Sequence, residues 1–454
     1  MMKSLFDEAH LMLQIIRLLS KYNSRLDSFT LVCLLQGYIN QGAFLEGKVL
    51  HSYLVKIGAQ SNTFVWTALV DMYSKHGTME EACKVFSAMT EQTLVSWNVM
   101  IVGFVKHGLI DRAWKLFRQM LSDSMSPDVA TITSMVQACI ATRNLDSARL
   151  LHFFATLRNL DSHSLFGNAM TDLYGKFNYL NDAQCVFMRI EGKDSVSWAA
   201  MLSAYALAEL KDRCLISFYE MLQQDFKPDK STFLCILNVC ASLMTLDVGR
   251  IVHFLTVEAS VEQTIDISNA IMNMYNKCGC INDSQQVLRS MHACDTVSWN
   301  TMIAGFAQSG YGFEALQLLH EMEELGANMD YVTLVELLYA CSHAGILDVG
   351  ILLLFMLENE HGVRAGLDHC TGLLDLFGRT GRLDEAFNFV DRIPFQPSGT
   401  TWKSLLSGCR IHNDLRRAHT AAEFVVDLEP HCDAAYLLLY NTSAIAIYDD
   451  IIWQ

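Results

Sequence analysis

Cysteine and histidine are the residue types in this sequence best suited to metal binding or nucleophilic chemistry, but their spacing supports neither role. The chain has 14 cysteines and 15 histidines among 454 residues. A zinc-dependent hydrolase needs closely spaced ligands and a glutamate that moves protons, as in paired H-x-E and C-x-x-C segments. Neither segment occurs, and the one candidate ligand pair, Cys278-Gly279-Cys280, lacks partner ligands. Phosphate loops of the G-x-G-x-x-G or G-x-x-x-x-G-K-[ST] type are also absent. We therefore expect no metal, no cofactor and no enzymatic activity.

Several of these residues recur at a fixed spacing. Cys139, Cys240 and Cys341 follow one another at steps of 101 residues, and His152 and His253 are separated by the same step. Such regularity favours packing cysteines in a reducing compartment over disulfides or zinc ligands. For the histidines it favours a packing or surface role over catalysis.

A repeat of 101 residues runs through the chain. Val95-Ser96-Trp97-Asn98 is followed at that step by Val196-Ser197-Trp198-Ala199 and then by Val297-Ser298-Trp299-Asn300. Each block of 101 divides into units of 35, 35 and 31 residues, each about two helices long. From Ser28 onward the units are 28–62, 63–93, 94–128, 129–163, 164–194, 195–229, 230–264, 265–295, 296–330, 331–366 and 367–398.

The pattern within a unit predicts two helices. In unit 94–128, Trp97, Met100, Ile101 and Phe104 have the i, i+3, i+4, i+7 spacing of one helical face, and a second such face follows Gly108. The 51% hydrophobic share fits helices that are apolar both toward their partner and toward the next unit. No run reaches the ~18 apolar residues of a membrane span, so we expect no membrane contact.

The charge balance restricts the partners. The net charge is −16 and the isoelectric point about 5.3. Tight non-specific binding to nucleic-acid phosphates depends on clustered positive charge, which this composition does not favour. The acidic composition does not exclude a protein that recognises the bases of single-stranded RNA.

The first 27 residues do not have the sequence pattern of a targeting segment. Asp7 and Glu8 interrupt the opening, no cleavage site follows an apolar core, and no acid-poor, Arg/Ser-rich presequence is visible. Shifted by 303 residues, Leu13-Gln14-Ile15-Ile16 aligns with Leu316-Gln317-Leu318-Leu319. We therefore expect the chain to begin inside a repeat, truncated at its start either in nature or in the gene model.

The units resemble those of plant pentatricopeptide repeat (PPR) proteins. The resemblance rests on the alternating lengths of 35, 35 and 31 residues, the V-S-W-N openings, and segments such as Met72-Tyr73 and Ala340-Cys341-Ser342. The resemblance covers residues 1 to about 443. The units are similar to the L, S and P motifs of the PLS class of this family. The resemblance implies an all-α, right-handed α-solenoid of helix-turn-helix repeats, with a partial P-type repeat at residues 1–27 and eleven tandem repeats at 28–398.

The C-terminal region is also similar to that family. Thr401-Trp402 and Cys409-Arg410-Ile411-His412 resemble the start of an E-type extension motif, which we place at residues 399–430. Residues 431–454 form an incomplete second extension motif, which departs from the pattern at about Thr442. No DYW-type deaminase domain is recognised.

The resemblance implies which residues would read RNA. PPR proteins bind single-stranded RNA at one base per repeat through two or three side chains. The reading positions are the fifth residue of a unit's first helix and the last residue of the unit. These pairs are Asn98/Asp128, Asn168/Asp194, Ala199/Asp229, Asn269/Asp295 and Asn300/Asp330. An amide offers a base both a donor and an acceptor, and a carboxylate can orient it.

In this family Asn with Asp implies uracil, so we expect uracils at the second, fourth, seventh and eighth bases of a ten-base target starting at unit 63–93. Ala199/Asp229 lacks the amide and should read weakly. The second residue of a unit usually holds the base with an aliphatic side chain, as Val95, Leu165, Val196 and Val297 could. Asp266 breaks that pattern beside Asn269.

Other roles compete for these residues. Asparagine and aspartate favour helix starts without any ligand, although four pairs at the same phase argue against capping alone. Trp97, Trp198 and Trp299 could stack on bases, but their helical phase favours core packing.

The sequence thus predicts a non-catalytic adaptor that binds uracil-biased single-stranded RNA in an organelle, the mitochondrion first and the chloroplast as the alternative. The resemblance implies C-to-U editing with a DYW-type deaminase or other editing factors supplied in trans. Organellar RNA processing, splicing or stabilisation would use the same surface. A helical-repeat scaffold that binds a basic protein, or a defective relative, are the rival hypotheses.

Overall fold

Helices make up nearly all of the regular structure in the computed structural model, which describes residues 27–58, 62–359, 365–429 and Leu437. These residues form 24 helices and no strand, with one isolated bridge between His163 and Glu191. The predicted all-helical repeat fold is therefore confirmed. Apart from Asp27, the partial repeat predicted at 1–27 lies outside the described residues, as does the second extension motif apart from Leu437.

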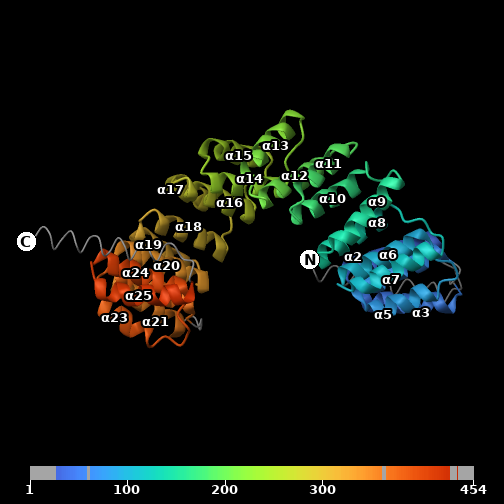
Figure 1. Ribbon diagram of the computed structural model, residues 1–454. Coiled ribbons are helices and arrows are strands. Elements are labelled where there is room, and N and C mark those ends of the chain that lie inside the picture. The colour runs from blue at the N-terminus through green and yellow to red at the C-terminus, as the bar shows by residue number, and fades with distance from the viewer. Residues whose placement is uncertain (1–26, 59–61, 360–364, 430–436, 438–454) are drawn as a thin grey trace, which may run out of the picture. The chain divides into compact units, whose positions relative to one another are not determined.

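The chain divides into an N-terminal part, residues 1–229, and a C-terminal part, residues 230–454. The helices of the N-terminal part (Figure 1) are α2 (Ser28–Gln41), α3 (Phe44–Lys56), α4 (Thr63–His76), α5 (Met79–Ser87), α6 (Leu94–Lys106), α7 (Ile110–Ser122), α8 (Val129–Thr142), α9 (Leu145–Leu157), α10 (Ser164–Lys176), α11 (Leu180–Arg189), α12 (Ser195–Leu207) and α13 (Lys211–Gln223).

The helices of the C-terminal part are α14 (Lys230–Leu243), α15 (Leu246–Glu258), α16 (Ile265–Lys277), α17 (Ile281–Ser290), α18 (Thr296–Gln308), α19 (Gly312–Glu324), α20 (Tyr331–Ala344), α21 (Leu347–Asn359), α22 (Leu367–Arg379), α23 (Leu383–Val390), α24 (Gly399–Ile411) and α25 (Leu415–Leu428).

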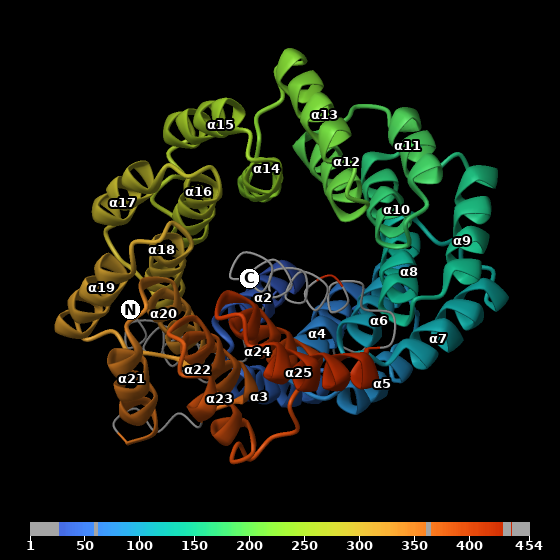
Figure 2. The same ribbon diagram turned by 60° about the vertical axis from the view of Figure 1, so that its left-hand side comes forward.

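Each part is a stack of helix pairs. The even-numbered helix opens a pair and packs both on its odd-numbered partner and on the opening helix of the next pair. In the C-terminal part, Figure 2 shows α16, α18, α20 and α22 side by side in one row, with α17, α19 and α21 beside them in a second row. Each unit thus buries its apolar face against its neighbours, as in other solenoids.

The periodic apolar residues form the core. In α6, Trp97, Met100, Ile101 and Phe104 are at most 4% exposed, as the helical spacing predicts. Trp198 and Trp299 are also buried, so the packing role predicted for the three tryptophans is confirmed.

The cysteines at the 101-residue step belong to the same core. Cys139, Cys240 and Cys341 are fully buried in α8, α14 and α20. Burial raises the pKa of Cys139 to about 12 and that of Cys341 to about 11, which keeps both thiols protonated and unreactive near neutral pH. In the part of the chain that the structure describes, no cluster of His, Cys, Asp and Glu could hold a metal ion.

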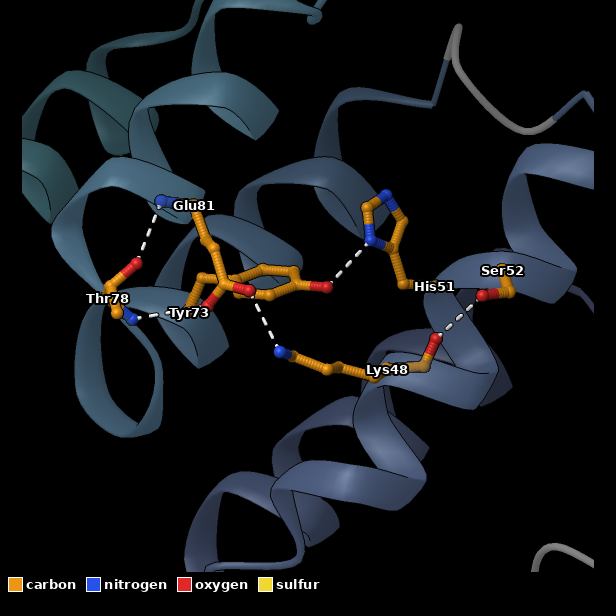
Figure 3. A network of polar contacts seen from close by, with 6 residues as sticks. All are labelled: Lys48, His51, Ser52, Tyr73, Thr78 and Glu81. Atoms are coloured by element: carbon orange, nitrogen blue, oxygen red, sulfur yellow. Dashed lines mark hydrogen bonds and ion pairs between the residues drawn. The ribbon is translucent and has the colours of Figure 1, made fainter.

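Polar contacts tie one helix pair to the next (Figure 3). His51 Nδ1 of α3 lies 2.9 Å from the hydroxyl of Tyr73 in α4. Beside it, Lys48 Nζ donates to Glu81 Oε1 over 2.8 Å, and Glu81 forms a capping box with Thr78. The His–Tyr contact recurs at 3.0 Å between His152 and Tyr174 and between His253 and Tyr275. The shared position of these histidines therefore has a packing role.

None of the helices within the described ranges is long and apolar enough to span a membrane.

Candidate nucleic-acid interface

Asn98 and Asp128 are brought together although 30 residues separate them. Asn98 is the fifth residue of α6, and Asp128 is the N-cap of α8, where its carboxylate accepts from the Thr131 amide over 2.8 Å. The Asn98 Nδ2 donates to both carboxylate oxygens of Asp128, over 3.1 and 2.9 Å. The Asn98 Oδ1 in turn accepts from the Thr131 hydroxyl. Helix packing and helix capping therefore place the amide beside the carboxylate.

The same arrangement recurs at Asn300 and Asp330 in the C-terminal part. Asn300 is the fifth residue of α18, and its Nδ2 donates to Asp330 Oδ1 over 3.1 Å. Asp330 caps α20 and forms a capping box with Thr333. The Thr333 hydroxyl donates to Asn300 Oδ1 over 2.7 Å, and the Asn300 side chain lies mostly out of solvent.

Two further pairs are looser. Asn168 Nδ2 donates to Asp194 over 3.3 Å, and Asn269 Nδ2 donates to Asp295 over 3.4 Å. Asp194 and Asp295 cap α12 and α18 in capping boxes with serines, Ser197 and Ser298. These four sets are called the Asn–Asp pairs below. In each, the aspartate is the helix cap and the asparagine is not, so capping alone does not explain the asparagines.

Hydrogen bonds keep three of the carboxylates ionised. Partial burial alone would raise the pKa of Asp330, but donation from the Thr333 backbone amide and from the Asn300 side-chain amide holds that pKa below its ordinary value. The pKa values of Asp194 and Asp295 are lowered in the same way, against partial burial, by donors from Ser197 and Asn168 and from Ser298 and Asn269. A carboxylate only accepts hydrogen bonds, so the asparagine atom that faces it must be the amide nitrogen.

The fifth predicted pair differs in chemistry. Ala199 occupies the fifth position of α12 and has no polar side-chain atom to present beside Asp229. Unit 195–229 therefore has no asparagine amide at this position to pair with Asp229.

A groove lies beside the Asn300–Asp330 pair. It has a volume of about 420 Å³ and is lined by residues of α16, α18 and α20 as well as Asp330. Val297 and Val332, 57% and 48% exposed, line it from successive units. The groove is thus lined by two aliphatic side chains together with an amide and a carboxylate, which are the kinds of group that contact the faces and the polar edge of a nucleobase.

The other predicted second-position residues are also available. Val95, Leu165 and Val196 are between 49% and 59% exposed although they are apolar. Asp266 departs from this set, and its carboxylate forms an ion pair with Lys230 Nζ at 2.5 Å.

Sequence reasoning missed four lysines that share one position within their units. Lys75, Lys106, Lys176 and Lys277 are exposed and occupy the thirteenth position of units 63–93, 94–128, 164–194 and 265–295. Lys75 and Lys176 form ion pairs with Asp71 and Asp172 one helical turn earlier. Lys277 has Asn273 at that position, donates to Gln308 Oε1 over 2.9 Å, and lines the groove. The shared position within the units was the signal that could have revealed these lysines.

A stack of helix pairs in which amide–carboxylate pairs recur at the junctions of successive units defines a helical-repeat protein with a recurring polar site. The model of the PPR repeat family matches residues 92–141, and the PPR repeat model matches residues 64–93 and 297–326. The chain is 30% identical over 446 residues to the chloroplastic pentatricopeptide repeat-containing protein CRR2 of Arabidopsis thaliana, covering 96% of this chain and 68% of the relative. The chain belongs to the pentatricopeptide repeat family.

Other relatives are longer than this chain. The chloroplastic protein DOT4 of Arabidopsis thaliana is 33% identical, over 93% of this chain and 48% of its own length. A mitochondrial member from the same plant is 30% identical, over 92% of this chain and 66% of its own length. The chain thus spans between about half and two thirds of the length of these relatives.

Solved structures support the fold. The maize protein PPR10 matches with a TM-score of 0.55 at 14% identity, over 95% of this chain and 73% of that chain. PPR10 in complex with an 18-nt psaJ RNA element matches with a TM-score of 0.59, at 14% identity and over 95% and 74% of the two chains.

Proposed function

We propose that this protein is a non-catalytic adaptor that binds single-stranded RNA sequence-specifically. The observation that carries the proposal is the series of four Asn–Asp pairs, each at the same place in its unit and each with the amide nitrogen directed to a carboxylate. A partly buried asparagine amide costs desolvation and takes no part in the cap, so an apolar side chain would be more stable at the four asparagine positions. Their repetition favours a ligand with a repeated polar edge.

The pairs suit uracil. One hydrogen of the asparagine Nδ2 is committed to the carboxylate, and the other remains to donate to a base. Uracil has a carbonyl acceptor at C4, whereas cytosine has an amino donor there. The groove beside Asn300, with Val297 and Val332 on its walls, offers a place for the ring.

The RNA targets that we propose are organellar transcripts. CRR2 and DOT4 are chloroplastic and another relative is mitochondrial by name, and PPR10 has been solved with a bound RNA element. We further propose that the chain is a PLS-class protein with an E-type extension at 399–430, and that it selects sites for C-to-U editing by a deaminase supplied in trans. Processing, splicing or stabilisation of transcripts is the alternative for the same surface.

A gel-shift titration tests the RNA proposal. The probe is a ten-base RNA with uracils at the second, fourth, seventh and eighth positions, compared with an RNA that has adenines there. We expect the uracil RNA to bind more tightly, and Asn98→Ala/Asn300→Ala to lose about 1–3 kcal/mol for each contact removed.

The matched control is Asn282→Ala, because Asn282 is an exposed asparagine on α17, which does not open a unit. It should bind both RNAs like the wild type. Equal binding of the two RNAs by the wild-type protein would contradict the proposal.

One observation favours a protein-binding scaffold as the second candidate. Apolar pairs recur, between 54% and 69% exposed, on the second helices α9, α15 and α21. They are Leu150/Phe153, Ile251/Phe254 and Leu352/Phe355. Exposed apolar surface of this kind marks protein contacts, and the net charge of −16 would suit a basic partner. Failure of both RNAs to bind would make these pairs the next residues to substitute.

A further inference from the structure

The four Asn–Asp pairs are of two kinds, which differ in what the asparagine oxygen contacts. In units 94–128 and 296–330 the Oδ1 of Asn98 and Asn300 accepts from the hydroxyl of Thr131 and Thr333. In units 164–194 and 265–295 a serine occupies the corresponding place in the capping box. The Oδ1 of Asn168 and of Asn269 is buried and receives no hydrogen bond from any residue that the structure describes.

Among the described residues, the two serine hydroxyls form hydrogen bonds only with the aspartate of their own capping box. Ser197 Oγ and Ser298 Oγ each lie 2.9 Å from Oδ1 of their aspartate and accept from the aspartate N–H. The threonine hydroxyls lie 2.8 Å from the aspartate oxygen and reach the asparagine as well. The asparagine–aspartate contact is shorter beside threonine, 2.9 and 3.1 Å, than beside serine, 3.3 and 3.4 Å.

These contacts decide how firmly the amide is held. An amide with a carboxylate on its nitrogen and a hydroxyl on its oxygen is fixed at both ends. Exchanging the two ends of the amide would place its oxygen against a carboxylate oxygen. It would also break the hydrogen bond that the amide oxygen accepts from the threonine hydroxyl. An amide held only at its nitrogen, by a single longer bond, turns at a lower cost.

We propose that Thr131 and Thr333 are positioning residues that fix the amides of Asn98 and Asn300, so that units 94–128 and 296–330 discriminate uracil from cytosine strictly. The proposal rests on the proposed RNA-binding function. Both threonines are fully buried, so they act through the asparagine and do not contact RNA. Units 164–194 and 265–295, which lack this support, tolerate either pyrimidine.

The chemistry of the two pyrimidines gives the reason. A fixed amide presents its remaining N–H to the base, which pairs with the C4 carbonyl of uracil and opposes the C4 amino group of cytosine. An amide that is held only at its nitrogen can rotate away from the carboxylate by breaking that one long bond, and its oxygen can then accept from the amino group of cytosine. Discrimination therefore follows from the rigidity of the amide and not only from its presence.

The test compares Thr333→Val with Ser298→Ala, two variants in the same part of the chain that each remove the hydroxyl of a capping box. Only Thr333 contacts an asparagine that we assign to base reading, so Ser298→Ala controls for the loss of the cap. The measurement is the ratio of dissociation constants for cytosine and uracil RNAs. For Thr333→Val the substituted base is the one assigned to unit 296–330, and for Ser298→Ala it is the one assigned to unit 265–295.

We expect Thr333→Val to lower the cytosine-to-uracil ratio by roughly fivefold, the effect of one hydrogen bond, while Ser298→Ala leaves its ratio unchanged. Thr333→Ser, which keeps the hydroxyl, should retain the wild-type ratio. If Thr333→Val does not fold, Thr131→Val with Ser197→Ala makes the same comparison in the N-terminal part.

An unchanged ratio in folded Thr333→Val, or an equal fall in Ser298→Ala, would overturn the positioning role while uracil preference persists in the wild type. Wild-type protein without any uracil preference would instead refute the proposed function, so the two failures are distinguishable.

Discussion

At the scale of single residues, one aspartate does two tasks in each Asn–Asp pair. Asp330 caps α20 through the Thr333 amide and also holds the Asn300 amide, and both contacts favour its ionised form. The cap fixes where the carboxylate lies, since the capping geometry is set by the first turn of the helix. The residue that caps α20 therefore also orients the Asn300 amide of the preceding helix pair.

The His–Tyr contacts predict a dependence of stability on pH. Burial lowers the pKa of His51, His152 and His253 below the ordinary histidine value. Between the folded and the unfolded pKa the unfolded chain binds more protons, so stability rises with pH through that window. The contribution is fully present above about pH 6.5, the ordinary histidine pKa, and is lost as the pH falls through the folded pKa.

Melting temperatures at about pH 5 and pH 7.5 check this expectation. The triple variant His51→Asn/His152→Asn/His253→Asn should show a smaller difference between the two pH values than the wild type. The control Asn282→Ala, at an exposed position without a titratable group, should leave the difference unchanged. An unaltered pH dependence in the triple variant would contradict the assignment.

At the scale of elements, the turn between the two helices of most units contains a left-handed residue, whereas in unit 63–93 Gly77 has a φ of −104°. Gly108, Glu209 and Gly310 occupy the same position at steps of 101 residues, with φ values of 71°, 58° and 80°. Glycine adopts this conformation without the steric cost of a side chain. In the middle unit, therefore, a glutamate adopts a left-handed backbone conformation that is strained for a residue with a side chain.

Glu209→Gly should raise the free energy of unfolding by about 1 kcal/mol, because it removes the left-handed strain. Chemical denaturation checks the change, and Gly310→Ala should lower the stability by a similar amount. A destabilised Glu209→Gly protein would show that the Glu209 side chain contributes more than its backbone costs.

At the scale of the whole molecule, a net charge of −16 is an unusual background for binding RNA. The exposed lysines at the thirteenth position supply local positive charge, but Lys75 and Lys176 are paired with aspartates. Lys277 has Asn273 in place of that aspartate and lines the groove beside Asn300. Phosphate contacts are therefore expected to be few, and base contacts to carry a large share of the affinity.

The salt dependence of RNA binding measures these contacts. We expect a shallow slope of log affinity against log salt, and Lys277→Ala should reduce its magnitude by about 0.7, the value for one phosphate on a single strand. Lys48→Ala is the control, because Lys48 lies on the second helix α3 and pairs with Glu81. A slope that Lys277→Ala leaves unchanged would place the phosphates elsewhere.

The sequence by itself determined the helix pairs, the packing tryptophans and cysteines, and which asparagines and aspartates share a position. The helix pairs and the packing residues follow from spacing, since residues at equal phase in equal units meet equal surroundings. The pairing of the asparagines with the aspartates was implied by the resemblance to the family. It also predicted the RNA-reading role of the Asn–Asp pairs, which stays a prediction until binding is measured.

Only the tertiary structure decided which amide oxygens have a partner, that Val332 of one unit shares a groove with Val297 of the previous one, and that Lys277 lies beside them. Threonine and serine are alike in a sequence pattern, yet one hydroxyl reaches the neighbouring asparagine and the other does not. The Asn–Asp contacts of the two kinds of pair differ by a few tenths of an ångström, and hydrogen bonds are sensitive to that scale while repeat spacing does not encode it.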